Sequence, residues 1–341
     1  MRLLFVMPLV CGLLWGLATP APAGDAPVRF EYTEPHMGVP VKLALYSADR
    51  QVANSAAEAV YARFAELNRL LSDYDPQSEL SRLSRSSPHD SPQPVSDPLW
   101  LLLVRSQELA EQTGGAFDVT VGPMVRLWRR ARRSAELPST TRLEEARARV
   151  GYQFLKLDPS HQAVQLTRPG MQLDLGGIAM GYAVDEGLKI LAARGVTSAM
   201  IDASGDIGVS DAPPGSRGWR IGIMPLAPDG PPSRFLLLSN AAITTSGDAF
   251  QHVTIEGKRY SHIVDPRTAL GLSDQSAVTV VARDCITVDS LATAVSVLGP
   301  EAGLKLIESQ TDVAALILRG GDRPQVYESS RWKNLSFEPS K

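Results

Sequence analysis

The stretch Leu173–Asp185, LDLGGIAMGYAVD, constrains the fold of this chain more than any other. A short apolar run ends in Gly176 and Gly177, and a helical pattern begins directly afterwards. Adjacent glycines let the backbone adopt positive φ angles and let another group approach closely. The first N–H groups of the following helix have no intrahelical partner, and the helix dipole favours an anion there. We therefore expect a strand-to-helix turn that holds a ligand, with Asp174 beside it as an acceptor. The alternative is a tight connection with a packing glycine.

Composition and charge limit the function classes. The chain has 341 residues, of which 44% are hydrophobic and 21% are charged, so it can bury a large core as one large domain or two. The formal net charge is −3 and no long basic run is present, which argues against nucleic acid or an anionic membrane surface as a partner. The local basic cluster Arg126–Arg133, RLWRRARR, is interpreted as a solvated helix face.

The first 23 residues have the pattern of a cleavable signal peptide. Arg2 forms a short positive region, Leu3–Leu17 is apolar but too short for a comfortable membrane span, and an A-x-A site ends at Ala23. We expect a soluble exported protein, periplasmic or otherwise secreted, whose single mature domain covers residues 24–341. Cleavage would leave Cys285 as the one cysteine, so no internal disulfide is expected.

The remaining pattern predicts an α+β fold. Helices are expected over residues 52–71, 78–83, 98–112, 124–133, 182–194, 288–298 and 301–309, with one more opened by a capping box at 141–144. Strands are expected over residues 28–31, 41–46, 154–157, 163–166, 198–201, 219–224, 235–238, 242–245, 252–256, 259–264, 276–282 and 314–318, and a short extended piece over 116–123. Short links between the strands favour antiparallel pairing. We expect two packed halves, mostly antiparallel sheets flanked by helices, with a ligand cleft between them.

Four further stretches carry polar side chains at the ends of predicted elements. They are Gly205-Asp206, Ile243–Asp248, Tyr260–Thr268 and Val288–Thr293. In the last of them, Asp289 and Thr293 are four residues apart and share a helix face. A carboxylate with a hydroxyl one turn further on suits a hard cation such as Mg²⁺. The alternative is a helix N-terminus with a core-facing threonine.

His262 stands two residues before a predicted turn. Taken alone, it is more typical of a strand histidine whose ring a neighbour satisfies. The other histidines show no ligand spacing and are interpreted as structural: His36, His89, His161 and His252.

Together these segments resemble one family, the ApbE-like flavin transferases, which are FAD:protein FMN transferases. The resemblance covers nearly the whole mature chain. It is carried by Met37-Gly38, Leu70–Tyr74, Thr113–Pro123, Asp174–Ala179, Thr245–Asp248, Ser261–Pro266 and Asp289–Thr293. The resemblance implies an ApbE-like α+β fold with the flavin cleft between its two halves.

The resemblance also implies a role for each matching residue. The implied FAD-binding residues are Met37, Tyr74, Ala116, Phe117, Asp118, Asp174 and Met180. The implied metal ligands are a backbone oxygen of Gly177 or Ala179 and the side chains of Asp289 and Thr293. His262 matches the residue expected to act as the base.

The implied activity is Mg²⁺-dependent transfer of FMN from FAD to a Ser or Thr of an exported or membrane-bound redox protein, through a phosphoester. Two alternatives are an FAD pyrophosphatase that releases FMN and AMP, and a flavin-binding or delivery protein without turnover. Three departures from the family pattern stand out. Met180 replaces a frequent lysine, Ser204 replaces a usual glycine, and Arg129-Arg130 replaces a glycine-containing continuation.

Overall fold

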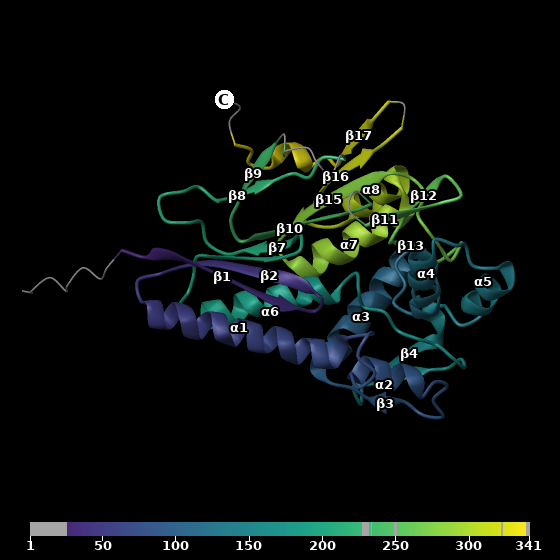
Figure 1. Ribbon diagram of the computed structural model, residues 1–341. Coiled ribbons are helices and arrows are strands. Elements are labelled where there is room, and N and C mark those ends of the chain that lie inside the picture. Colours follow the sequence, from purple (N-terminus) through teal and green to yellow (C-terminus); the bar gives the residue numbers. More distant parts are fainter. Residues whose placement is uncertain (1–25, 227–231, 233, 249–250, 322, 339–341) are drawn as a thin grey trace, which may run out of the picture.

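An eight-stranded sheet forms the centre of the computed structural model, which describes residues 26–226, 232, 234–248, 251–321 and 323–338 (Figure 1). Every pair of neighbouring strands in this sheet is antiparallel, as the short links predicted. The order across the sheet is β1 (Val28–His36), β2 (Val39–Ser47), β6 (Ala199–Ala203), β7 (Asp206–Val209), β10 (Ala241–Gly247), β15 (Ser276–Ala282), β16 (Ala314–Arg319) and β17 (Gln325–Glu328). The predicted signal peptide, residues 1–23, lies outside the described residues.

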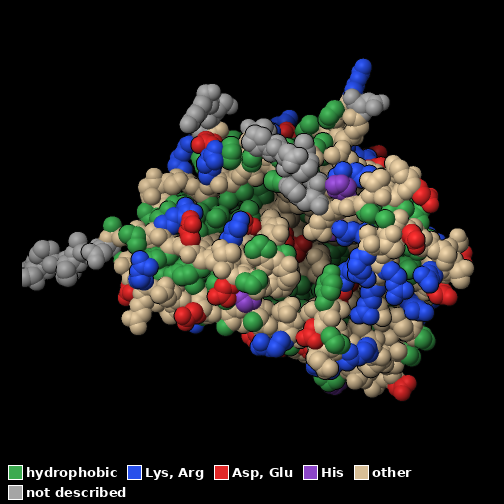
Figure 2. All heavy atoms as spheres, in the orientation of Figure 1, with side chains coloured by type: hydrophobic (Ala, Val, Ile, Leu, Met, Phe, Trp, Pro, Cys, Tyr) green, Lys and Arg blue, Asp and Glu red, His purple; other side chains and the backbone are tan. Residues whose placement is uncertain are grey.

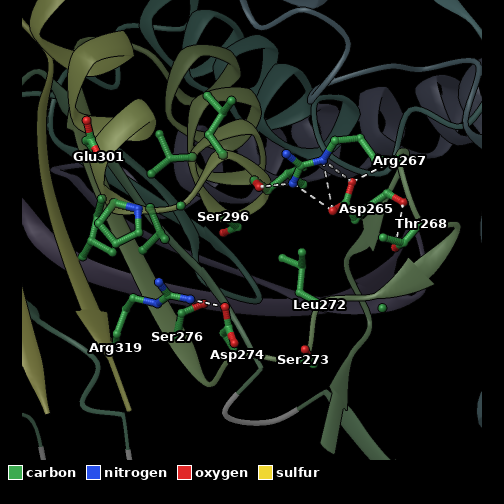
Figure 3. A pocket seen from close by; sticks show the side chains of 18 residues that line it. Asp265, Arg267, Thr268, Leu272, Ser273, Asp274, Ser276, Ser296, Glu301 and Arg319 are labelled. Atoms are coloured by element: carbon green, nitrogen blue, oxygen red, sulfur yellow. Dashed lines mark hydrogen bonds and ion pairs between the residues drawn. The ribbon is translucent and has the colours of Figure 1, made fainter. Parts of the chain in front are cut away.

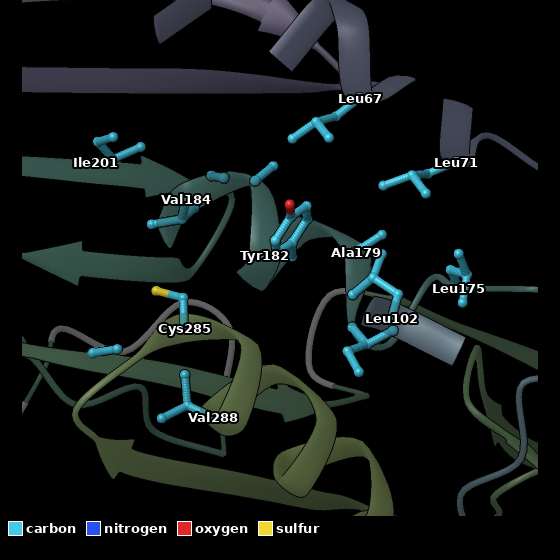
Figure 4. Close-up of a cluster of buried hydrophobic side chains, with 14 of the residues drawn as sticks. Leu67, Leu71, Leu102, Leu175, Ala179, Tyr182, Val184, Ile201, Cys285 and Val288 are labelled. Carbon is cyan, nitrogen blue, oxygen red and sulfur yellow. The ribbon is translucent and has the colours of Figure 1, made fainter. Parts of the chain in front are cut away.

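Helices cover one face of this sheet. They are α1 (Arg50–Leu71), α6 (Ala179–Ala193), α7 (Cys285–Leu298) and α8 (Pro300–Ser309). Figure 4 shows the core between them, where Tyr182 and Val184 of α6 lie close to Cys285 and Val288 of α7. Because strand side chains alternate between faces, Leu43 and Leu45 point into this core while Ala44 points away from it.

The opposite face of the sheet packs against a hairpin of β8 (Trp219–Gly222) and β9 (Phe235–Leu238). Trp219 and Leu236 from this hairpin, together with Trp332 near the C-terminus, form a second buried cluster against the sheet.

A second part of the molecule lies to the right in Figure 1. It contains α2 (Glu79–Arg85), α3 (Asp97–Gln112), α4 (Gly122–Ser134), α5 (Thr140–Arg147), a small sheet of β3 (Gln93–Pro94), β5 (Ala163–Leu166) and β4 (Leu155–Asp158), and the hairpins β11 (His252–Ile255)–β12 (Lys258–Ser261) and β13 (Val264–Asp265)–β14 (Leu270–Gly271). Trp128 of α4 is buried against Tyr260, and its indole N–H donates to the carbonyl of Ser261 at 2.9 Å. This contact holds α4 next to the loop that carries His262.

Two helices begin earlier than the sequence pattern predicted, because carboxylates both near and distant in the chain accept hydrogen bonds from the first N–H groups of these helices. Helix α6 begins at Ala179, not at residue 182, and α7 begins at Cys285, not at 288. Asp284 caps α7 by accepting from the N–H of Thr287 at 2.9 Å. Asp185 of α6 accepts from the N–H groups of Cys285 and Ile286.

The predicted capping box at residues 141–144 is wrong. The N-cap of α5 is Ser139, whose hydroxyl accepts from the N–H of Arg142 at 3.5 Å. Helix α3 begins at Asp97, one residue before the predicted start at 98, and its N-cap residue is Ser96.

The extended piece predicted over residues 116–123 is also wrong. Its residues form turns that lead into α4, because the Asp118 carboxylate accepts from the N–H of Thr120 at 2.8 Å and closes the chain locally. Within the described residues, no helix is both long and apolar enough to cross a bilayer.

Candidate active site

A cavity of about 400 Å³ lies between the two parts of the molecule, bounded by α4, the Gly-Gly turn, the loop after β12 and helix α7. It brings together predicted site residues from five separate regions of the chain. Those that line it are Tyr74, Ala116, Phe117, Asp118, Asp174, Gly177, His262 and Thr293.

Four other predicted site residues do not line this cavity. Met37 lies in the β1–β2 turn with φ of 50° and, like Met180, packs against the main core. Val39, two residues after Met37, lines the cavity. Ala179 and Asp289 are buried behind the lining, Asp289 one helical turn before Thr293.

Asp174 forms an ion pair that the sequence analysis did not include. Its Oδ1 accepts from the N–H of Gly176 at 2.8 Å, and its Oδ2 accepts from the Arg129 guanidinium at 3.0 Å. Arg129 also bonds to the Asp73 carboxylate and lies 4.2 Å above the Tyr74 ring. Burial and the nearby Asp73 raise the pKa of Asp174, and Arg129 opposes that rise. Arg129 therefore contacts two of the implied FAD-binding residues, Asp174 and Tyr74.

Asp118 uses its carboxylate to hold the turn that forms one cavity wall. Oδ1 accepts from the N–H and the hydroxyl of Thr120 at 2.8 and 2.7 Å, and Oδ2 accepts from the N–H of Tyr152 at 2.9 Å. Burial raises the pKa of Asp118, and these hydrogen bonds oppose the rise. Its carboxylate therefore shapes the cavity wall by fixing the backbone.

The two glycines of the Gly-Gly turn allow other groups to approach the backbone closely. The expected positive φ angles are not found there. Neither Gly176 nor Gly177 is among the positive-φ glycines. A Cβ on Gly177 would lie 2.9 Å from Oγ1 of Thr293, and one on Gly176 would lie 2.9 Å from Oδ1 of Asp174. Glycine suits both positions because the side chains of Asp174 and of the distant Thr293 pack directly on the backbone.

Helices α6 and α7 exchange hydrogen bonds at their N-termini. The N–H of Gly181 in α6 donates to Oδ2 of Asp289 in α7 at 3.1 Å. In the other direction, Asp185 of α6 accepts from the N–H groups of Cys285 and Ile286 at 2.7 and 2.9 Å. The N-terminal ends of both helices therefore face a carboxylate of the other, which suits their dipoles.

The residues implied for a metal fit a hard cation. Asp289 is buried, and no described residue donates to its Oδ1 or places a cation beside it. Burial raises its pKa well above the usual value, and the neighbouring Asp206 and Asp185 raise it further. A buried carboxylate of this kind is stabilised by a bound cation. Among the described residues no group of three or more His, Cys, Asp or Glu is arranged as a metal site, and the implied ligand set contains one such side chain, Asp289.

His262 has one ring nitrogen engaged and the other available. Its Nδ1 lies 3.3 Å from the carbonyl of Gln251, so Nδ1–H donates and Nε2 is left as the acceptor. Burial and, to a smaller extent, the positive charge of Arg132 together lower the pKa of His262 to about 4. The imidazole is therefore neutral at pH 7, which is the form a general base requires.

Arg129 and Arg132 of α4 both line the cavity and were not predicted as site residues. Their signal in the sequence was the basic cluster Arg126–Arg133, which we assigned to a solvated face. Burial lowers the pKa of Arg132, and no described acidic side chain pairs with it. An unpaired cation in a cavity is the arrangement expected of an anion site.

A second cavity, of about 380 Å³, lies at the C-terminal end of α7, where Val295, Ser296, Val297 and Leu298 line it (Figure 3). Both of its arginines are already paired, Arg267 with Asp265 and Arg319 with Asp274. It contains none of the predicted site residues.

Comparison with known proteins gives a consistent result. The model of the ApbE family matches residues 37–317. The FAD:protein FMN transferase of Vibrio cholerae is 32% identical over 274 residues, covering 79% of this chain and 80% of that protein. The FAD:protein FMN transferase of Treponema pallidum is 31% identical over 314 residues and covers 86% of each chain.

Solved structures match the whole architecture. The flavin transferase ApbE from Vibrio cholerae superposes with a TM-score of 0.80 at 28% identity, covering 91% of this chain and 99% of that one. The apbe protein from Thermotoga maritima superposes with a TM-score of 0.81 at 27% identity, covering 91% and 100%. These matches confirm the predicted fold of helices and antiparallel sheets.

Proposed function

The chain belongs to the ApbE family, and from this premise we propose that it is a Mg²⁺-dependent FAD:protein FMN transferase whose acceptor is a Ser or Thr of an exported or membrane-bound redox protein. The observation that carries the proposal is the meeting of His262, Asp174 and Thr293 around one cavity that also contains an unpaired arginine. A base, a hydroxyl ligand and cationic charge are what transfer at a pyrophosphate requires.

The chain's own residues account for binding and proton transfer. Tyr74 offers an aromatic surface for the flavin ring, and Asp174 accepts from its ring or ribose donors. Arg129 and Arg132 attract the pyrophosphate. Asp289, Thr293 and a backbone oxygen of Gly177 or Ala179 would hold Mg²⁺, which when bound neutralises phosphate charge and favours departure of AMP.

Nε2 of His262 takes the proton of the acceptor hydroxyl. The hydroxyl oxygen then bonds to the phosphorus of the FMN phosphate, and the bond from that phosphorus to the AMP phosphate breaks. The products are a protein–FMN phosphoester and AMP, and the proton stays on His262 until it reaches solvent.

We also propose that the protein acts after export. Support comes from the signal-peptide pattern of residues 1–23. N-terminal sequencing of the mature protein tests this proposal, with Gly24 or a residue close to it expected as the first residue. An uncleaved N-terminus would contradict it.

One experiment separates the proposed function from its alternatives. Purified protein is incubated with FAD and MgCl₂, with and without a threonine-containing redox subunit, and AMP release is measured. Release that depends on the subunit supports the transferase. Release without it identifies a pyrophosphatase, and bound but intact FAD identifies a carrier.

A further inference from the structure

Arg126, Arg130 and Arg133 of the basic cluster are exposed, as the interpretation of a solvated face predicted, and they also line a groove. Helix α4 places Arg126, Arg129, Arg130 and Arg133 along a groove of about 490 Å³, and Arg85 of α2 lines its other side. We call this set the arginine groove. Figure 2 shows Lys and Arg side chains gathered beside a hollow in the part of the view where Figure 1 places α4 and α5.

The positive charge of the arginine groove is largely uncompensated. Helix α4 carries no acidic side chain. Asp73, the one acid among the described residues that line the groove, is already bonded to Arg129. Arg130 and Arg133 pair with no described acidic side chain. The groove is thus strongly cationic in a chain whose net charge is −3.

The positive surface continues beyond this groove. A neighbouring depression of about 280 Å³ shares Arg126 and Arg130 and adds Arg142 and Arg149. Glu145 is the single acid in the part of its lining that the structure describes. A surface of this size attracts a polyanion more strongly than it attracts a single small ion.

The arginine groove adjoins the cavity of about 400 Å³ in the candidate active site, which we call the flavin cavity. Asp73, Tyr74 and Arg129 line both of them. A chain segment lying in the groove would therefore pass the Tyr74 ring and reach the mouth of the cavity, where an acceptor hydroxyl has to arrive.

We propose that the arginine groove binds an acidic segment of the acceptor protein, close in its sequence to the Ser or Thr that receives FMN. This inference rests on the proposed function, because that function requires a protein to approach the cavity. The planar guanidinium group of arginine suits a carboxylate, because it can donate two parallel hydrogen bonds to the two carboxylate oxygens. A concave groove fits an extended chain better than it fits a flat bilayer. Opposite charges would also speed the encounter of the two proteins.

The test uses the double variant Arg130→Glu/Arg133→Glu, since neither residue lines the flavin cavity. The probe is a fluorescein-labelled deca-glutamate peptide, and its affinity is measured by fluorescence anisotropy at low ionic strength. We expect binding to the full wild-type chain and at least about tenfold weaker binding to the variant, with unchanged FAD affinity. High salt should weaken the wild-type interaction.

The matched control is Arg194→Glu/Arg283→Glu, which makes the same change in net charge at two exposed arginines outside the groove. An equal loss of peptide affinity in this control would show that the overall charge of the protein, and not the arginine groove, determines binding, and it would overturn the proposal. Binding of phosphatidylglycerol vesicles without binding of the peptide would overturn it in favour of a membrane surface. Absence of any peptide binding to the wild type would also overturn it.

Thermal melting shows whether the double variant is folded, and Arg130→Gln/Arg133→Gln replaces it if it is not. Peptide binding is measured without turnover, whereas AMP release reports on the proposed function. Failure of the arginine groove and failure of the transferase assignment are therefore seen in different measurements.

Discussion

The backbone N–H of Gly181 donates to Oδ2 of Asp289 at 3.1 Å, across a sequence separation of 108 residues. This hydrogen bond joins α6, the helix that follows the Gly-Gly turn, to α7, which carries Asp289 and Thr293. A Cβ on Gly181 would lie 2.3 Å from the carbonyl oxygen of Cys285, so the two helices meet backbone to backbone. The position of Asp289 therefore depends on the absence of a side chain at residue 181.

Gly181→Ala should separate α6 from α7 at this contact. The clash is with backbone, which cannot swing aside, so we expect a loss of roughly 1–3 kcal/mol in the free energy of unfolding together with impaired turnover. Thermal melting and AMP release measure the two effects. Gly187→Ala is the control on the same helix, because its closest contact, at 2.6 Å, is the flexible end of the Ile201 side chain. Equal behaviour of the two variants would contradict this account.

Asp289→Asn should stabilise the metal-free protein and abolish its response to Mg²⁺. Because burial raises the pKa of Asp289, ionising it costs free energy in the folded state, and this cost is present above the unfolded pKa of roughly 4. Without metal at pH 7, the variant should therefore melt at a higher temperature than wild type. Added MgCl₂ should raise the melting temperature of wild type only, and turnover should be lost in the variant.

The control for this variant is Asp284→Asn at the N-cap of the same helix. Asparagine caps helices about as well as aspartate does, so the response to MgCl₂ should persist there. A Mg²⁺-dependent rise in the melting temperature of Asp289→Asn would show that the metal binds elsewhere.

His262→Ala should slow FMN transfer at least about a hundredfold, because a positioned general base contributes roughly 10²–10⁴-fold. FAD affinity and the Mg²⁺ response should stay close to wild type. His252→Ala is the matched control, since His252 lies on the adjoining hairpin and its Nδ1 likewise pairs with a carbonyl, that of Asp248, at 3.0 Å. If the His262 variant instead loses melting temperature and FAD affinity while its transfer rate stays high, His262 has a structural role.

The pH dependence of transfer should reflect the low pKa of His262. With a pKa of about 4, the base stays neutral well below pH 6.5, so the acid limb of kcat/KM should lie near pH 4 to 5. Arg132→Gln should move this limb upward, though not to 6.5, because burial is the larger cause of the shift. Arg133→Gln, an exposed neighbour outside the cavity, should leave the limb unchanged.

The same pKa makes a prediction for stability. An unfolded histidine titrates near 6.5 and the folded one near 4, so the unfolded chain binds more protons between these values. The stabilising contribution of His262 to the free energy of unfolding is therefore fully present above pH 6.5 and is lost as the pH falls toward 4. In His262→Ala this part of the decline in the free energy of unfolding should be missing, which urea titrations at several pH values can measure.

Much of the architecture was predictable from local pattern. The alternating run at 41–46 and the apolar stripe at 52–71 correspond to β2 and α1, and the short links correspond to antiparallel pairs. The errors came from polar residues whose side chains can hydrogen-bond to the nearby backbone in more than one way. At 116–123 the Asp118 side chain closes a turn, and at α5 a serine two residues before the expected Thr141 provides the cap.

The sequence by itself determined the kinds of element, their order and the motifs that indicate a flavin transferase, because propensity and periodicity act over a few residues. The tertiary structure decided which distant groups meet. The charge of Arg129 was visible in the sequence, yet only packing of α4 against the Gly-Gly turn pairs it with Asp174 and places it above Tyr74. Gly181 was also evident in the sequence. The reason that a glycine is required there is the carbonyl of Cys285, over a hundred residues away, which leaves no room for a side chain. Such contacts depend on how whole helices pack, and a pattern that extends over a few residues does not specify which distant residues will meet.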